Sequence, residues 1–166
     1  MRAHSTKIEA MKIFVEYGLT RLTWDIQELD ETILNWRINQ KGNSVKWLLT
    51  HISMILNVYF PRAFTSNLSY LPENWPPEYH DNDKLTLEAI LNDIENGKNE
   101  ALNGFNQLSE GALDEILDWY IGEEPRETYL MILSSEILHH EGQIASIIGL
   151  KKRLNGEPTR VVPPEA

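Results

Sequence analysis

The stretch PRETYLMILSSEILHHEGQIASIIGLKKRLNG, residues 125–156, decides the fold of this chain. Its apolar residues recur at steps of three and four, which is the period of one face of an α-helix. Proline suits the first position of a helix, and the closing Asn155-Gly156 pair is a usual C-terminal cap. The stretch therefore predicts one long helix from Pro125 to Leu154.

Three more helices follow from the same kind of pattern. The first is predicted to begin near Thr6, because Thr6 and Glu9 have the spacing of a capping box. The second is predicted to begin after the turn-and-cap cluster at residues 41–44, and the third near Thr86. Helices of this length and number predict an all-α fold, a four-helix bundle with one long crossover connection.

The connections are less regular than the helices. Pro61 is expected to end or kink the second helix, since proline lacks a backbone N–H. Residues 65–85 contain three prolines and no period, which favours a loop that shapes the mouth of a site. The stretch 108–124 allows either a short helix or an extended apolar cover.

Composition limits the classes of function. The 166 residues predict one domain over 1–166, with a core of about 5–155 and an extended proline-rich tail at 157–166. A net charge of −10 argues against nucleic acid or an anionic membrane as partner. No apolar run approaches a membrane span, and the N-terminus lacks the apolar core of a secretory signal. With no cysteine, these features lead us to expect a cytoplasmic protein.

Several polar residues of the last helix fall on its apolar face. At about 100° per residue, His140 points along the centre of the apolar stripe. Glu136 lies about 40° to one side of it, and Gln143 lies on the same flank. His139 falls about 100° away, at the edge of the stripe, and is the weaker candidate.

The second helix supplies one more coordinating side chain, because His51 is centred among apolar residues. A buried carboxylate is costly unless it is paired, hydrogen-bonded or bound to a metal. His51, Glu136 and His140 together predict a divalent metal site. Three protein ligands leave a position open for water or substrate, as in catalytic metal sites.

The same residues have a simpler interpretation, in which each histidine is an ordinary core residue and Glu136–His140 is a buried ion pair. His4 and His80 are expected to be solvated. The chain has no glycine-rich phosphate loop and no G-x-S-x-G turn, so nucleotide-dependent and serine hydrolase chemistry lack support.

Two segments resemble motifs of the DinB/YfiT-like superfamily of four-helix proteins. Residues 42–52, GNSVKWLLTHI, resemble its second-helix pattern, and residues 136–144, EILHHEGQI, resemble its last-helix pattern H-x-x-H-H-R-G-Q. Residues 29–37 fit the link between the first two helices. Element order and spacing agree over about residues 5–155.

The resemblance implies an up-down-down-up bundle, often a homodimer, with a three-histidine divalent metal site. Members include transferases and isomerases that use low-molecular-weight thiols such as bacillithiol or mycothiol. By position the metal ligands fall on His51, Glu136 and His140, with Gln143 and His139 as second-sphere candidates. Glu136 replaces a usual histidine and Glu141 a usual arginine, so the metal could be Zn, Ni or Fe.

The leading hypothesis is a metal-dependent enzyme that acts on a small electrophile. The reaction would be either transfer of a thiol to this electrophile or its hydrolysis. The alternative is a non-catalytic dimeric bundle, stress-related or ligand-binding, whose metal site is vestigial. A third interpretation places a small organic ligand between helices lined by Trp47 and Tyr129.

Overall fold

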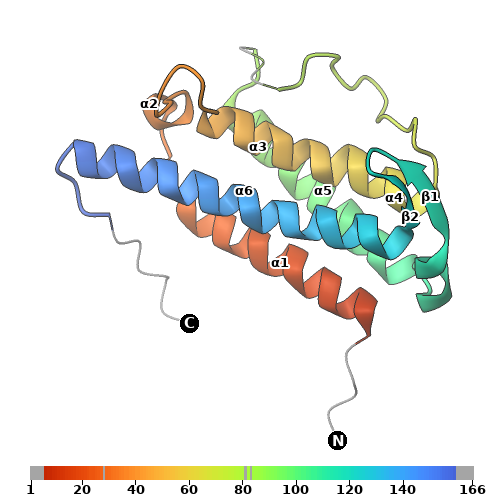
Figure 1. Ribbon diagram of the computed structural model, residues 1–166. Coiled ribbons are helices and arrows are strands. Elements are labelled where there is room, and N and C mark those ends of the chain that lie inside the picture. Colours follow the sequence, from red (N-terminus) through yellow and green to blue (C-terminus); the bar gives the residue numbers. More distant parts are fainter. Residues whose placement is uncertain (1–5, 28, 81, 83, 160–166) are drawn as a thin grey trace, which may run out of the picture.

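The computed structural model describes residues 6–27, 29–80, 82 and 84–159 (Figure 1). His4 and residues 160–166 of the predicted tail lie outside this range. Helices dominate, as expected for an all-α protein, but a small β-hairpin is also present. The elements in order are α1 (Lys7–Asp25), α2 (Glu31–Leu34), α3 (Val45–Met54), the π-helical turn η1 (Ile55–Tyr59), α4 (Phe60–Thr65), α5 (Leu87–Gln107), the 3₁₀ turn η2 (Glu110–Asp114), β1 (Ile116–Trp119), β2 (Gly122–Pro125) and α6 (Arg126–Leu154).

The four predicted helix starts are confirmed, and three of them have the same local cause. The side-chain oxygens of Thr6, Ser44 and Thr86 each accept a hydrogen bond from the backbone N–H three residues later. Such a cap satisfies one of the N–H groups that the first turn of a helix leaves without a partner.

Pro61 neither ends the second helix nor breaks it sharply. The turn η1 precedes it, and Pro61 then occupies the first turn of α4, where a missing N–H costs little. The helix ends five residues later in a left-handed residue, Ser66, with φ 58°. Residues 45–65 therefore form one long helical segment with a π-helical turn in its middle.

The long helices pack side by side around a shared apolar core. α1 packs along α6, and α3 packs against both α5 and α6. In Figure 1, α1 and α6 run from right to left while α3 and α5 run from left to right. Glycines allow close approaches, because a Cβ on Gly18 would lie 2.9 Å from Cγ2 of Ile137, and one on Gly104 would overlap the ring of Phe64.

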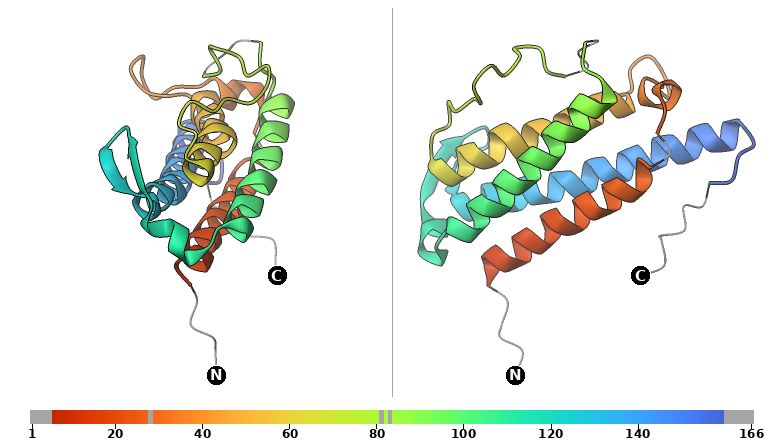
Figure 2. Two further views of the ribbon diagram at one scale, coloured as in Figure 1. Left: turned by 90° about the vertical axis from the view of Figure 1, so that its right-hand side faces the viewer. Right: turned by 180° about the vertical axis from the view of Figure 1, so that it is seen from behind.

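The stretch 108–124 was expected to be either a short helix or an extended apolar cover. It contains a short 3₁₀ turn, η2, followed by two strands that pair with each other. β1 and β2 form an antiparallel hairpin in which Trp119 faces Gly122 and Ile116 faces Pro125. Figure 2 shows the hairpin at the end of the molecule where α6 begins, and the α4–α5 loop along the outside of α3 and α5. Among the described residues, no helix is both long and apolar enough to cross a membrane.

Candidate metal centre

The three side chains singled out from the sequence come together between α3 and α6. His51 of α3 and Glu136 and His140 of α6 each offer a ligand atom, and these atoms lie within 4.8 Å of one another. Nε2 of His140 lies 3.2 Å from Oε2 of Glu136, one helical turn earlier. The rings of His51 and His140 meet edge to face, with centroids 4.7 Å apart.

Gln143 orients the imidazole of His140. Oε1 of Gln143 lies 2.9 Å from Nδ1 of His140, and its Nε2 lies 3.1 Å from Nε2 of His139. In this arrangement Nδ1–H of His140 donates to the amide oxygen, and the amide N–H donates to His139. In the neutral ring the lone pair is then on Nε2, the nitrogen that faces Glu136 and His51, as in metal-binding histidines held by a second-sphere acceptor.

Aromatic rings hold His51 from the other side. Its ring stacks on Trp47 at 5.1 Å and lies 5.2 Å from the ring of His80, which also stacks on Trp47. Burial, followed by the charges of His140 and His80, lowers the pKa of His51 to about 4. At neutral pH His51 is therefore an uncharged imidazole with a free lone pair, the form that binds metals.

These residues fit a divalent cation. Within the described part of the chain, Nδ1 of His51 and Nε2 of His140 are buried nitrogens with no hydrogen-bond partner of good geometry. Nε2 of His140 lies 3.2 Å from a carboxylate oxygen, a contact that either a proton on the imidazole or a cation bound between the two would make favourable. Two imidazoles and one carboxylate are a known donor set for zinc and for iron.

A cavity of about 430 Å³ opens beside the cluster. One wall is formed by successive turns of the α3–η1–α4 segment, and the opposite wall by the hairpin and α6. The π-helical turn η1 lies in the first wall, a position often found at functional sites. The lining residues are His51, Ile55, Tyr59, Arg62, Trp119, Tyr120, Ile132, Leu133 and Glu136.

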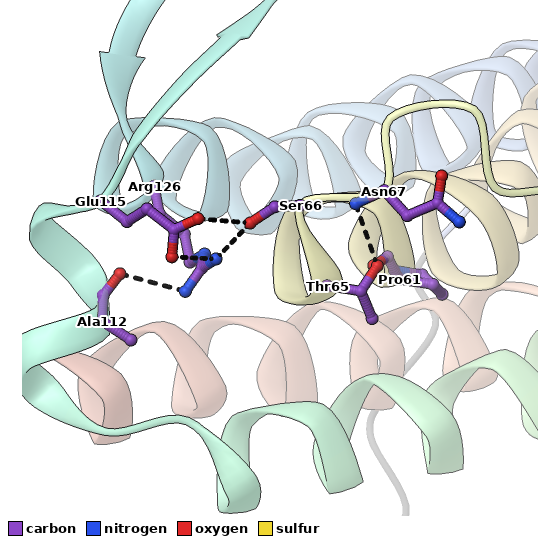
Figure 3. Close-up of polar contacts among 7 residues, drawn as sticks. All are labelled: Pro61, Thr65, Ser66, Asn67, Ala112, Glu115 and Arg126. Atoms are coloured by element: carbon purple, nitrogen blue, oxygen red, sulfur yellow. Dashed lines mark hydrogen bonds and ion pairs between the residues drawn. The ribbon is translucent and has the colours of Figure 1, made fainter.

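A buried arginine anchors the hairpin that forms the far wall. Figure 3 shows the guanidinium of Arg126, at the start of α6, between the hairpin and the end of α4. Its Nη1 donates to the carbonyl oxygen of Ala112 at 3.1 Å, and its Nη2 donates to Ser66 Oγ at 2.6 Å and to Glu115 Oε2 at 2.8 Å. The hydroxyl of Tyr129 holds the tip, accepting from Trp119 N–H and donating to the carbonyl oxygen of Gly122.

The structure corrects three expectations for the site. Glu136 is not buried, because 40% of its side chain is exposed where α6 faces the cavity. His80 is not solvated, because the loop presses it against Trp47 and His51. Tyr129 cannot line a ligand site, because it is fully buried and bonded to the hairpin.

The sequence reasoning missed Arg62, Trp119 and Tyr120 as residues of the cavity. Arg62 could have been found from the sequence, because it continues the steps of three and four residues that run from His51 along one face of the second helix. Trp119 and Tyr120 carry no such signal, because a hairpin brings them to the cavity from a distant part of the chain.

The departure at Glu141 has a structural counterpart on α1. Glu141 is 3% exposed, and its Oε1 accepts from Nε of Arg21 at 3.0 Å. The arginine that the family motif usually has at position 141 is absent, and the positive charge at this place comes instead from Arg21 of α1. Burial and the neighbouring Glu141 carboxylate raise the pKa of Asp25 to about 7, while Arg21 acts in the opposite direction.

Comparison with known proteins agrees with the motifs. No curated protein gives a significant match to the chain. The family model of the DinB superfamily matches residues 16–144, more than half of the chain, and includes all three residues of the cluster. This match and the helical fold place the chain in a known family: it belongs to the DinB superfamily.

Proposed function

We propose that this protein is a divalent-metal-dependent enzyme whose metal is held by His51, Glu136 and His140. The single observation that carries the proposal is the convergence of three ligand atoms within 4.8 Å at the edge of an open cavity. When bound, a divalent cation supplies Lewis acidity, which favours the deprotonated form of a water or thiol. The reaction we propose is transfer of a low-molecular-weight thiol to a small electrophile, or hydrolysis of that electrophile.

The residues around the cluster have different roles, which follow from their positions. His51 presents a neutral nitrogen, and Gln143 holds the ring of His140 with its Nε2 toward the cluster. Glu136 reaches the cluster from the cavity wall, so its second oxygen is available to a substrate group. The aromatic side chains of Tyr59, Trp119 and Tyr120 limit the water around the site.

The test is elemental analysis of the untagged protein, beside H51A, H140A and the control H139A. We expect about one Zn, Ni or Fe per chain in the parent and in H139A, and loss of the metal in H51A and H140A. The same metal should raise the thermal midpoint of the parent and of H139A but not of H51A or H140A, because ligands that bind the folded state stabilise it. A parent that stays metal-free after incubation with these ions and dialysis would refute the proposal.

One observation favours a second candidate function, a non-catalytic helical protein with a vestigial site. The 3.2 Å contact of His140 with Glu136 is also what a structural ion pair would make. This candidate predicts that E136Q lowers the free energy of unfolding of the metal-free protein. The metal proposal predicts that E136Q lowers metal affinity instead.

We also propose an up-down-down-up four-helix arrangement and a homodimer. The opposite directions of α1 and α6 against α3 and α5 favour the former (Figure 1). Exposed apolar side chains on α1, Ile13, Phe14 and Tyr17, each about half exposed, favour the latter. F14E should yield monomers by light scattering, with the parent as a dimer. The cytoplasmic location stays a prediction.

A further inference from the structure

We infer that the cavity beside the metal cluster takes a small aromatic or apolar carboxylic acid, with its carboxylate on Arg62. The part of the ligand that would reach the metal rests on the proposed function. The carboxylate end does not, because Arg62 and the aromatic wall are positioned without any metal.

Arg62 is held in place but leaves most of its donors available. Its Nε donates to the carbonyl oxygen of Tyr70 at 2.8 Å, which fixes the guanidinium from the side of the α4–α5 loop. Its carbon Cζ lies 5.9 Å from the ring centroid of Tyr59. Among the described residues no carboxylate forms an ion pair with it. The two Nη groups therefore form a donor fork in the cavity wall, the geometry that matches a carboxylate.

Tyr59 separates this arginine from the metal cluster. Its ring centroid is 6.5 Å from that of His51 and 5.7 Å from that of Trp119. Trp119 in turn lies 4.8 Å from Tyr120, edge to face. The path from Arg62 to the metal ligands thus runs along aromatic faces, which favour a flat or apolar middle section in the ligand.

Size and charge narrow the ligand further. A cavity of about 430 Å³ is at the small end of ligand sites, which favours a compact molecule over a nucleotide or a peptide. The net charge of −10 repels polyanions at long range, so a single carboxylate suits this protein better than a polyphosphate. One guanidinium fork balances one such group.

The experiment compares matched probes on metal-free protein by calorimetry. The probes are 3-phenylpropanoate and 3-phenylpropanamide, which differ in charge and share size and shape. The variants are R62Q and, as a control, R153Q, which removes an equal charge from an exposed position near the end of α6. Circular dichroism establishes that each variant is folded.

We expect the acid to bind the parent and R153Q roughly ten-fold or more tightly than the amide, because a charge-assisted hydrogen bond is lost with the carboxylate. In R62Q the ratio should fall to about one. Equal binding of acid and amide to the parent, no binding of either, or an unchanged ratio in R62Q would overturn the inference.

A second pair of probes tests the link to the metal. On zinc-loaded protein, 4-(mercaptomethyl)benzoate should bind more tightly than 3-phenylpropanoate, and H140A should remove that gain while keeping the preference for a carboxylate. If zinc does not bind but the acid is still preferred, the proposed metal function fails and the carboxylate site stands. If zinc binds and R62Q does not change the preference for the acid, the carboxylate site fails and the proposed metal function stands.

Discussion

Replacement of Arg126 by methionine tests whether the anchoring of the hairpin builds the cavity wall. Arg126 is 4% exposed, and its side chain donates to Ala112, Ser66 and Glu115 (Figure 3). Methionine keeps the apolar stem and the approximate volume but removes all three hydrogen bonds. The variant isolates the polar contribution of this residue.

The expected loss in free energy of unfolding depends on whether water can reach each acceptor once the arginine is gone. Breaking a buried charged contact costs about 3–5 kcal/mol when its partner stays buried. Ser66 is exposed, and half of the Glu115 side chain reaches water, so both can be rehydrated. Methionine also avoids the burial of the unpartnered Nε of Arg126. We therefore expect R126M to lower the free energy of unfolding by about 2–3 kcal/mol. At this chain length that is a fall of about 5–10 °C in Tm.

Two measurements check this prediction. Urea unfolding gives the free energy, with E115Q as a control that removes one charge, keeps one oxygen to accept from Arg126 and should lose less. Hydrogen exchange of the Trp119 amide, which donates to Tyr129, gives the local effect and should become faster in R126M. A loss below about 0.5 kcal/mol with unchanged exchange would refute the reasoning.

Three further predictions concern pH, packing and the metal. Because the pKa of Asp25 is raised to about 7, the folded protein keeps a proton that the unfolded chain releases above pH 4. Stability should therefore fall as pH rises from 4 to 7. D25N should remove roughly 1–2 kcal/mol of that fall in urea unfolding at pH 5 and 8, after discounting for solvent screening. G104A should destabilise by about 1–3 kcal/mol, since its Cβ would clash with Phe64, whereas G142A, with open space around it, should not; thermal unfolding compares them. Q143M removes the acceptor that orients the last-helix imidazole and should weaken metal affinity roughly 10–100-fold by competition titration, and unchanged affinity would count against that role.

Local rules determined where the helices lie. Thr6, Ser44 and Thr86 are caps because a short side chain with an oxygen can reach the free N–H groups of the next turn. Such contacts span three residues, so they are readable from the sequence. The proximity of Glu136 and His140 is readable for the same reason, since residues four apart in a helix are neighbours.

The sequence predicted only in part that His51 lies close to Glu136 and His140. Apolar periodicity indicates that His51 points inward, and any two inward faces of a small bundle are near each other. It does not fix their relative height along the helix axes. The resemblance to the DinB superfamily supplied that pairing, and the structure agrees with it.

The sequence by itself determined the helical class, the helix starts and the inward direction of His51 and His140, because these depend on periodicity and short-range hydrogen bonds. Only the tertiary structure decided that Glu136 opens to a cavity, that His80 covers His51, and that Arg62 faces a wall built by a hairpin. Those features depend on contacts between distant residues, such as Arg126 with Ser66, 60 positions apart. No local pattern encodes such contacts, because they arise from how whole elements pack.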